Sequence, residues 1–480
     1  MLRFRGAYIK GRFTRPERPR VQHVKRDPGD ISRIVGEWSD TTSEVATAVE
    51  AAASAFDEWA WQSQDYRFSC LKRLQAALEQ HHDELADRIA SEMGKILPEA
   101  HAEVEAAIRK IDITINEGMK LVETKQVNSG TQYYRYHPRG VLAILGPFNF
   151  PVHLPNSHWV PALATGNTIV FKPSELTPFT GQLLARCFKE ADFPPGVFNM
   201  VQGGKKVGTA LVKHPKVAGV LFVGSDETGH AIQRETREDT GKICVLEMGG
   251  KNAAIILPDG SVDLALRDCA RSAFATTGQR CNSLSRVIIH QDLVTNFTIE
   301  LACEALSWHA GYYKDERVMM GPLVSKPAMR RFLQYQDKAV KEGGHAVLKG
   351  RRIQPGRKGH YVLPGIHRME TAEPATERRG YRYDEIFGPD IAIYTFKTLE
   401  EAIRIHNDSR YGLVASVYTK KKKDFETMFR YLQVGNLHWN RPTIGASPHL
   451  PFGGLKASGN DRPAGIMSAL YCAYPVAVRT

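Results

Sequence analysis

Three short segments of the chain carry side chains that could perform covalent chemistry. The first is Gly278-Gln279-Arg280-Cys281, in which a cysteine follows a turn that contains glycine. A cysteine in such a turn can expose its sulfur and lie near backbone N–H donors, which suits a nucleophile. The alternative is a small buried side chain without reactivity, the commoner role of a single cysteine. Cys281 is therefore a candidate nucleophile.

A carboxylate in the second segment, LEMGGK at 246–251, is a candidate base. Glu247 follows an apolar run and precedes two glycines, which let another backbone or a ligand approach closely. Burial at the end of a strand raises the pKa of a carboxyl group and suits it to accept a proton. The alternative is a structural glutamate in a salt bridge.

An amide in the third segment, GPFNFP at 146–151, is a candidate oxyanion donor. Asn149 lies between two prolines, which makes the turn around it rigid. The turn follows an apolar run, and open α/β sheets place their sites at the ends of such strands. The alternative is that the asparagine only serves the turn, as it often does.

Two further segments are candidates for binding a cofactor, although the chain has neither GxGxxG nor a P-loop. In FVGSDETG, at 222–229, a strand runs through a glycine turn into a helix. This leaves N–H groups free for a phosphate, but Ser225 is equally suited to cap the helix. In FKPSE, at 171–175, Lys172 and Glu175 follow a strand and could bond ribose hydroxyls.

The elements that must position these residues can be read from the apolar pattern. Residues 41–118 read as helix, with Thr42 and Ser43 expected to cap the first segment. Continuous apolar runs then alternate with helical stretches, as in a parallel sheet covered on both faces. These runs are 141–145, 168–171, 197–201, 220–223 and 243–246.

A second alternating series begins after Lys251 and continues to about residue 440. Its first members are a strand at 253–257, a helix at 263–275, a strand at 286–290 and a helix at 294–307. The sequence therefore predicts two doubly wound α/β domains in tandem. Between helix and sheet, the aromatic segment 132–137 is expected to pair with a strand-like tail at 471–478 and to make an oligomer contact.

Composition limits the classes of protein. Of the 480 residues, 42% are hydrophobic and 24% charged, which is typical of a soluble globular protein. No apolar run is long enough for a membrane span, and the basic N-terminus lacks the apolar core of a secretory signal. An Ala7-Tyr8-Ile9 strand and a turn at Gly11 are expected there instead.

The formal net charge of +12 could indicate a nucleic-acid binder. The basic residues are scattered, however, and the densest run, Lys420 to Lys423, opens a polar helix. An anionic small substrate is the preferred reading of the charge. The seven cysteines form no CxxC, which predicts neither disulfides nor a metal site and favours a reducing cytoplasm.

Taken together, these segments resemble the aldehyde dehydrogenase superfamily over nearly the whole chain, with the motifs in the family's order. The matching pieces are GPFNFP (146–151), ALATGNTIVFKPSE (162–175), FVGSDETG (222–229), LEMGGKN (246–252), GQRC (278–281), DEIFGP (384–389), NDSRYGL (407–413) and PFGGLKASG (451–459). The resemblance implies an NAD-binding domain at 1–121 and 140–248, a catalytic domain at 249–445, and an oligomerisation arm and tail at 122–139 and 446–480. Dimers or tetramers are the family norm, so a homodimer or homotetramer is expected.

The resemblance also implies a mechanism. The Cys281 thiolate attacks an aldehyde, Asn149 and the Cys281 backbone N–H hold the oxyanion, hydride passes to the cofactor, and Glu247 activates water that hydrolyses the thioester. Lys172 and Glu175 are expected on the adenine ribose, Ser225 on the pyrophosphate, Glu385 on the nicotinamide ribose and Phe387 near the nicotinamide. The full expected cofactor set is Lys172, Ser174, Glu175, Gly224, Ser225, Thr228, Gly229, Glu385 and Phe387. Because Glu175 would repel a 2′-phosphate, NAD is expected, with NADP possible but disfavoured.

Segments 153–156, 439–442, 458–463 and 471–476 are similar to those of the bacterial N-succinylglutamate 5-semialdehyde dehydrogenases. The chain departs from them at Asp461 and at Asn282-Ser283. A dicarboxylate aldehyde is therefore the expected substrate, with glutamate or succinate semialdehyde as alternatives. The expected substrate contacts are Arg280, Arg441, Gly445, Ala446, Ser447 and Arg462. A non-catalytic binding protein is the remaining alternative, against which the intact Cys281, Glu247 and Asn149 argue.

Overall fold

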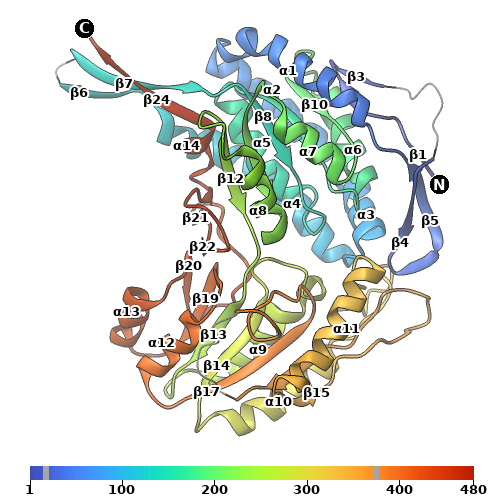
Figure 1. The fold of residues 1–480 in the computed structure, drawn as a ribbon, viewed down its shortest axis with the longest axis vertical. Coiled ribbons are helices and arrows are strands. Elements are labelled where there is room, and N and C mark those ends of the chain that lie inside the picture. Colours follow the sequence, from blue (N-terminus) through green and yellow to red (C-terminus); the bar gives the residue numbers. More distant parts are fainter. Residues whose placement is uncertain (15–20, 129, 371–377) are drawn as a thin grey trace.

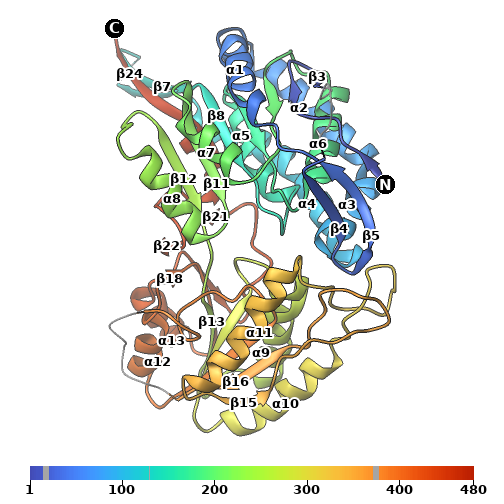
Figure 2. The same cartoon turned by 45° about the vertical axis from the view of Figure 1, so that its right-hand side comes forward.

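The structure is a computed structural model that describes residues 1–14, 21–128, 130–370 and 378–480. Figures 1 and 2 show two lobes, one drawn mainly in blue and green and the other in yellow and orange, with a thin arm that leaves the first lobe. Each lobe is built around a seven-stranded sheet. The predicted α/β class is confirmed.

The first sheet has the order β12-β11-β8-β9-β10-β2-β3. Its parallel strands are β8 (Val141–Leu145), β9 (Thr168–Lys172), β10 (Phe198–Met200), β11 (Val217–Val223) and β12 (Ile243–Glu247), and the edge is extended antiparallel by β2 (Tyr8–Ile9) and β3 (Arg12–Phe13). The five predicted apolar runs are these parallel strands, and the predicted strand and turn near the N-terminus are β2 and the residues after it. Fully apolar runs form buried parallel strands because both faces are covered.

The two faces of the first sheet contribute to different cores. Leu142 and Ile144 of β8 pack into one core, whereas Val141, Ala143 and Leu145 pack into another. The neighbouring strands and the helices of this lobe supply further residues of both cores. The helices are α1 (Val45–Ala60), α2 (Gln64–Gln80), α3 (His82–Met93), α4 (Leu97–Asn116), α5 (His153–Ala164), α6 (Pro178–Glu190), α7 (Lys205–Lys213) and α8 (Asp226–Thr236).

The second sheet has the order β15-β16-β17-β14-β13-β19-β20, parallel except for β15. Its strands are β13 (Asn252–Ile256), β14 (Leu284–His290), β15 (His345–Leu348), β16 (Gly365–Arg368), β17 (Asp390–Phe396), β19 (Val414–Tyr418) and β20 (Asn436–Trp439). Its helices are α9 (Val262–Phe274), α10 (Val294–Ser307), α11 (Lys326–Lys341), α12 (Leu399–Asn407) and α13 (Lys422–Tyr431). Cores again lie on both faces, so this sheet is doubly wound as predicted.

The arm is a three-stranded antiparallel sheet of β6 (Lys125–Asn128), β7 (Gln132–Pro138) and β24 (Ala473–Arg479). β24 pairs with β7 along its whole length, with Val476 opposite Arg135. This confirms that the aromatic segment pairs with the C-terminal tail. The arm projects from the body in both views.

Smaller elements complete the described chain. They are the sheet of β1 (Leu2–Arg3), β5 (Asp30–Trp38) and β4 (His23–Asp27), the pairs β18 (Tyr411–Gly412) with β22 (Leu455–Lys456) and β21 (Pro451–Phe452) with β23 (Ala464–Gly465), the 3₁₀ helices Thr42–Glu44, Gly118–Val122 and Ala275–Gly278, and α14 (Ser468–Cys472). Among the described helices, none has both the length and the apolar content needed to cross a membrane.

Two local predictions are wrong. Thr42 and Ser43 do not cap α1, because a 3₁₀ turn takes up residues 42–44 and the Ser43 hydroxyl bonds Glu44. The tail does not become a strand at Tyr471, because residues 468–472 form α14, where Tyr471 and Cys472 are buried. The division into domains stays a proposal, which the separation of the two sheets at residues 248–251 supports.

Candidate active site

The three candidate catalytic residues come from the two lobes and converge on one turn. Glu247 is the last residue of β12, and Asn149 lies four residues beyond the end of β8. β8 and β12 flank β11 in the same parallel sheet, so both residues lie at the carboxyl edge of that sheet. Cys281 lies in the turn between the 3₁₀ helix Ala275–Gly278 and β14 of the other lobe. This is the edge at which open α/β sheets place their sites.

The turn before Cys281 has an unusual backbone. Thr276, Thr277 and Gly278 have φ values of 54°, 58° and 68°, a left-handed conformation that threonine rarely adopts. A Cβ at Gly278 would lie 2.3 Å from the Gly388 carbonyl, so only glycine fits there. On the other side of Cys281, Asn252 Nδ2 donates to the Cys281 carbonyl at 2.7 Å. The nucleophile candidate is therefore held from both sides.

Asn149 reaches this turn directly. Its Nδ2 donates to the carbonyl of Gln279 at 2.9 Å, and its side chain is buried. The amide has a second N–H, which can donate to an oxygen near Cys281. Sequence reasoning predicted that the residues would act together, and the structure brings them together.

Glu247 is buried, and its Oε2 has no hydrogen-bond partner among the described residues. Burial raises its pKa well above the ordinary value, although a backbone hydrogen bond from Ala464 opposes this. A Cβ on Gly453 would lie 3.2 Å from Oε1, so the neighbouring chain is packed closely against the carboxylate. Glu247 forms no salt bridge with any described residue, so the structure does not support the structural alternative for this carboxylate.

The thiol of Cys281 lies in an environment that opposes its ionisation. Burial, helped by the nearby carboxylates Glu385 and Glu247, raises its pKa to about 12. Backbone N–H groups at Cys281 and Asn282 act in the opposite direction. Because the thiolate is the nucleophile, reaction requires that this balance be shifted.

Glu385 and Phe387 lie on the same side as the nucleophile. Glu385 Oε1 accepts a hydrogen bond from the Gly250 N–H at 3.0 Å, and a Cβ at Gly249 would lie 2.1 Å from Oε2. Burial raises the pKa of Glu385 to about 7. Phe387 has a φ of 58° and packs edge-on against Phe148, with 5.8 Å between ring centroids. Phe148 precedes Asn149, so Phe387 lies beside the turn that carries Asn149.

The candidates after β9 lie at the same sheet edge. Lys172 Nζ donates to the carbonyls of Pro173 and Gly203 at 2.9 and 2.8 Å, and burial lowers its pKa. It lies 3.7 Å from Glu175, whose carboxylate is 51% exposed and free to meet a ligand. The Ser174 hydroxyl accepts a hydrogen bond from the Leu176 N–H and is buried.

At the other cofactor candidate, Ser225 caps α8 and accepts from the Thr228 N–H, as the capping interpretation predicted. The Gly224 N–H donates to the Glu247 carbonyl at 3.0 Å, which links this turn to the candidate base. A Cβ at Gly229 would lie 2.3 Å from the Met248 sulfur. The first turn of α8 also carries Asp226, whose charge is offset by Arg410 at 2.8 Å.

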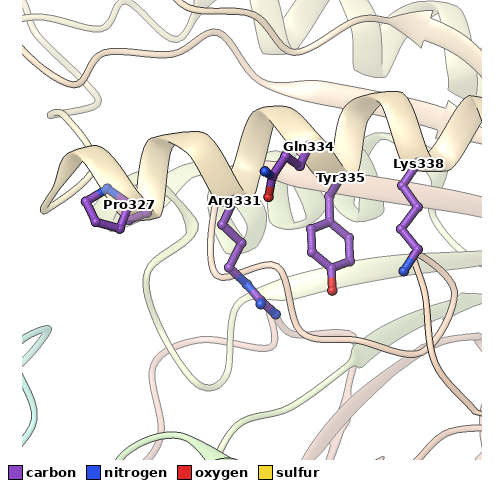
Figure 3. A pocket seen from close by; sticks show the side chains of 6 residues that line it. Pro327, Arg331, Gln334, Tyr335 and Lys338 are labelled. Carbon is purple, nitrogen blue, oxygen red and sulfur yellow. The ribbon is translucent and has the colours of Figure 1, made fainter.

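A cavity of about 590 Å³ lies along one side of α11 and is lined by side chains of that helix. Figure 3 shows Arg331, Tyr335 and Lys338 projecting from the same side of the helix. Arg331 Nη2 donates to the Glu385 carbonyl at 2.5 Å, and Tyr335 donates to Asp384. The cavity therefore adjoins the segment that carries Glu385 and Phe387.

The expected substrate contacts Gly445, Ala446 and Ser447 belong to the loop from Thr443 to Ser447. The Thr443 hydroxyl donates to the carbonyl of Asn282, the residue after Cys281, at 2.8 Å, so this loop lies beside the nucleophile turn. Gly445 has a φ of 84°, and Gly445, Ala446 and Ser447 are exposed. Arg441 is exposed as well, and its carbonyl accepts from Tyr418.

Two of the expected substrate arginines have other neighbours. Arg280 donates to the Thr276 hydroxyl at 2.8 Å and to Glu99 at 3.2 Å. Within the described chain, the hydrogen bond of the Arg462 guanidinium goes to the Asn460 carbonyl, and the residue lines a separate cavity of about 470 Å³ together with Arg139. The structure thus brings the loop to the site and gives Arg280 and Arg462 structural partners.

Sequence reasoning missed a group of charged residues behind Asn149 and Cys281. Lys95 and Glu103 form a fully buried pair at 2.7 Å, and Glu99 pairs with Arg280. The available signal was Glu103 on the apolar stripe of α4, beside Ala100 and Val104. A charged residue on such a stripe must be paired when it is buried.

Metal binding was not expected. The described residues do group His82, Asp83 and His101, with ligand atoms within 4.8 Å of one another, on α3 and α4. The Asp83 side chain is 90% exposed and hydrogen-bonds His82 at 2.9 Å. This is an ordinary surface histidine–carboxylate contact, and it involves none of the candidate catalytic residues.

Comparisons with known proteins agree with this geometry. Among curated relatives, N-succinylglutamate 5-semialdehyde dehydrogenase of Erwinia tasmaniensis is 36% identical over 95% of this chain and 91% of that protein. The enzyme of the same name from Escherichia coli strain K12 is 37% identical over 95% of this chain and 92% of that protein.

Solved structures of other dehydrogenases have the same fold as this chain. A 1-pyrroline-5-carboxylate dehydrogenase from Thermus with bound NAD is 30% identical, with a TM-score of 0.90 over 99% of this chain and 93% of that one. An indole-3-acetaldehyde dehydrogenase from P. syringae, in complex with NAD⁺, is 28% identical, with a TM-score of 0.92 over 100% of this chain and 97% of that one.

The model described as "Aldehyde dehydrogenase family" matches residues 20–475, nearly the whole chain. That span includes all the parallel strands of the first sheet, the whole second sheet, the arm strand β7 and all the candidate catalytic residues. The protein belongs to the aldehyde dehydrogenase family and is an oxidoreductase.

Proposed function

We propose that the protein oxidises an acidic semialdehyde to the carboxylic acid with NAD, through a thioester on Cys281. The observation that carries this proposal is the contact between Asn149 Nδ2 and the Gln279 carbonyl at 2.9 Å. It brings a rigid amide donor to the nucleophile turn, while a buried carboxylate of raised pKa, Glu247, lies near the same sulfur.

In the first half-reaction, the Cys281 thiol releases its proton to solvent, the resulting thiolate bonds to the aldehyde carbon, and the carbonyl oxygen becomes an oxyanion. Asn149 Nδ2 and the Cys281 N–H donate to that oxygen where the charge develops, which is the most effective use of fixed donors. When bound, NAD⁺ would supply the hydride acceptor and a positive charge on its ring. Loss of the hydride from the thiohemiacetal carbon would leave that carbon bonded to the Cys281 sulfur as a thioester.

In the second half-reaction, Glu247 accepts a proton from water, and the resulting hydroxide attacks the thioester carbonyl. The C–S bond breaks, the thiolate leaves, and the acid is released. A carboxylate with an unpaired oxygen in an apolar environment is suited to this role, because its raised pKa strengthens it as a base.

The chain's own residues fit a dinucleotide. The turn before α8 offers N–H groups for the pyrophosphate, and the charge of Asp226 there is already offset by Arg410. Lys172 and Glu175 lie at the end of β9, two strands away in the same sheet, for the adenine ribose, with Ser174 between them. Glu385 lies near Cys281 for the nicotinamide end, with Phe387 two residues further along the chain. Gly224, Thr228 and Gly229 shape the phosphate turn.

NAD is proposed over NADP because the exposed Glu175 carboxylate would face a 2′-phosphate. The test compares kcat/KM for the two cofactors in the wild type and in Glu175→Gln. The wild type should prefer NAD, and Glu175→Gln should narrow the difference by about tenfold, a typical effect of one like-charge contact. A wild type that prefers NADP would overturn the assignment.

For the substrate, N-succinylglutamate 5-semialdehyde is the favourite. The support is the name shared by curated relatives at 36% and 37% identity, together with the exposed small residues Gly445, Ala446 and Ser447 and the exposed Arg441. Arg280 and Arg462 stay as weaker candidates, since both have protein partners.

A panel of aldehydes assayed for NADH production tests this choice. Succinylglutamate semialdehyde should give the highest kcat/KM, above glutamate and succinate semialdehydes, and neutral aldehydes the lowest. Arg441→Gln should raise KM for the acidic aldehyde by roughly 30-fold if it pairs with a carboxylate, with little change for propanal. A preference for propanal or benzaldehyde would reject the substrate but not the family.

We also propose a homodimer or homotetramer that assembles through the arm. The support is a projecting three-stranded sheet with aromatic side chains and free edge strands. All seven cysteines are free thiols, which fits the reducing cytoplasm of a bacterium such as those of the relatives.

A further inference from the structure

We propose that two carboxylates one helical turn apart on α4, Glu99 and Glu103, hold the two oxyanion donors in register across the boundary between the lobes. Glu103 fixes the turn that carries Asn149, and Glu99 fixes the turn that carries Cys281. The inference rests on the proposed function and names the residues that position its site. Neither carboxylate touches the reacting atoms, so both are positioning residues.

Glu103 and its partner Lys95 contact the backbone of the turn that carries Asn149. Glu103 Oε1 accepts from the N–H groups of Val152 and His153 at 2.9 and 3.2 Å. Glu103 Oε2 accepts from Lys95 Nζ at 2.7 Å, and the same Nζ donates to the Asn149 carbonyl at 2.7 Å. The carboxylate and the ammonium together fix the turn from residue 149 to residue 153.

The Lys95–Glu103 ion pair has little freedom to move. The side chains of Lys95 and Glu103 are both 0% exposed. Lys95 Nζ also lies 3.6 Å from the centroid of the Phe150 ring, so the ammonium is held against the residue that follows Asn149. A buried ion pair tolerates little displacement, because separating the partners leaves a charge uncompensated.

Glu99 contacts the turn before Cys281, whose backbone is left-handed. Glu99 accepts from the Thr276 N–H and from the Thr276 hydroxyl, each at 2.9 Å. It also pairs with Arg280, which in turn donates to the Thr276 hydroxyl at 2.8 Å. Thr276 has a φ of 54°, a conformation that persists only where surrounding contacts enforce it.

The two sets of contacts are joined by the helix. Residues four apart lie on the same side of an α-helix, so Glu99 and Glu103 project together from the first turns of α4. One contacts the lobe that supplies the Cys281 N–H, and the other contacts the loop that supplies the Asn149 amide. The spacing between the two donors is thereby set by one rigid element.

The experiment compares Glu99→Gln and Glu103→Gln with Glu105→Gln in the full enzyme. Glu105 is the matched control, because it lies on the same helix in an exposed pair with Arg109. The rate of the NADH burst should fall by about 10- to 100-fold in both test variants, as expected for donors displaced by up to 1 Å. The KM for NAD should change less than about twofold, and Glu105→Gln should match the wild type.

Combination with Asn149→Ala separates positioning from general structural damage. If Glu103 acts through Asn149, Glu103→Gln should add less than about threefold to the loss in Asn149→Ala. Glu99→Gln should still slow Asn149→Ala by its full factor, because it acts on the other donor. Equal effects of Glu103→Gln in both backgrounds, or a loss seen only in thermal stability, would overturn the proposal.

Two further outcomes are distinguishable. A full burst rate in Asn149→Ala would reject the oxyanion assignment of the proposed function itself. A slow Asn149→Ala with unaltered Glu99→Gln and Glu103→Gln would reject only the positioning role. If Glu103→Gln does not fold, the Glu99 contacts decide: Thr276→Val should lower the burst rate like Glu99→Gln, Thr276→Ser should retain it, and equal rates in both would overturn the proposal.

Discussion

At the scale of single residues, the site combines a thiol that resists ionisation with a carboxylate that resists it too. Both effects have the same main cause, which is burial. Because its pKa is raised to about 12, the Cys281 thiol is expected to stay protonated at neutral pH unless a positive charge, such as that of the NAD⁺ ring, binds beside it. Such an environment protects a catalytic cysteine from unwanted chemistry, and it makes the thiol sensitive to a bound cation.

Alkylation of Cys281 by iodoacetamide should therefore depend steeply on pH. Because the pKa is raised to about 12, the thiolate fraction, and with it the rate, should rise about tenfold per pH unit from pH 6 to 9. Added NAD⁺ should accelerate the reaction. Peptide mass spectrometry distinguishes Cys281 from the exposed Cys303, and a plateau near neutral pH would contradict the proposed environment.

Glu247→Gln should separate the two half-reactions. Loss of the base should slow thioester hydrolysis by about 10²–10⁴-fold, while formation of the thioester continues. Stopped-flow absorbance should show a burst of NADH followed by slow turnover. If burst and steady state slow equally, Glu247 has another role.

The same substitution should change stability in a pH-dependent way. The folded-state pKa of Glu247 is raised, so the folded protein holds a proton that the unfolded chain releases above pH 4.5. Stability is therefore lost as pH rises from that value through the folded pKa. Urea unfolding should find Glu247→Gln more stable than wild type at pH 8 and similar to it near pH 4.5. The opposite trend would mean that the carboxylate is stabilised in its charged form.

At the scale of elements, the strands were predictable where their pattern was local. β8 and α10 have the bounds that their apolar residues predicted, because continuous apolar runs and helical periodicity need no distant partner to be recognised. The turn at Thr276 and Thr277 could not be predicted, since its left-handed backbone depends on Glu99, which is far away in the sequence. Similarly, Tyr471 and Cys472 are helical rather than extended because they pack into the core of the first lobe, which the local pattern does not reveal.

The arm strands allow a test of how the subunits assemble. Deletion of residues 473–480 removes β24 and leaves β7 paired only with β6. If the arm joins subunits, light scattering coupled to size exclusion should find a smaller assembly than in the wild type. An unchanged oligomer would place the interface elsewhere. Tyr134→Ser on β7, which leaves the backbone pairing intact, is a control for loss of strand structure.

At the scale of the whole molecule, the site exists because the lobes meet along the carboxyl edge of the first sheet. Motif order gave the family and the catalytic candidates, and the structure brings Asn149 to the Cys281 turn. What the motifs could not give is how the lobes are held in register. The lobes are held in register by Lys95, Glu99 and Glu103. Their roles could not be predicted, because they depend on contacts with residues about 50 to 180 positions away in the chain.

A thioester on Cys281 can be trapped by blocking its hydrolysis. Glu247→Gln mixed with NAD⁺ and succinylglutamate semialdehyde, then acid-quenched, should carry one acyl group on the peptide that contains Cys281. The adduct should be absent without NAD⁺ and absent in Glu247→Gln/Cys281→Ala. NADH formation with no adduct, or an adduct on another cysteine, would contradict the account.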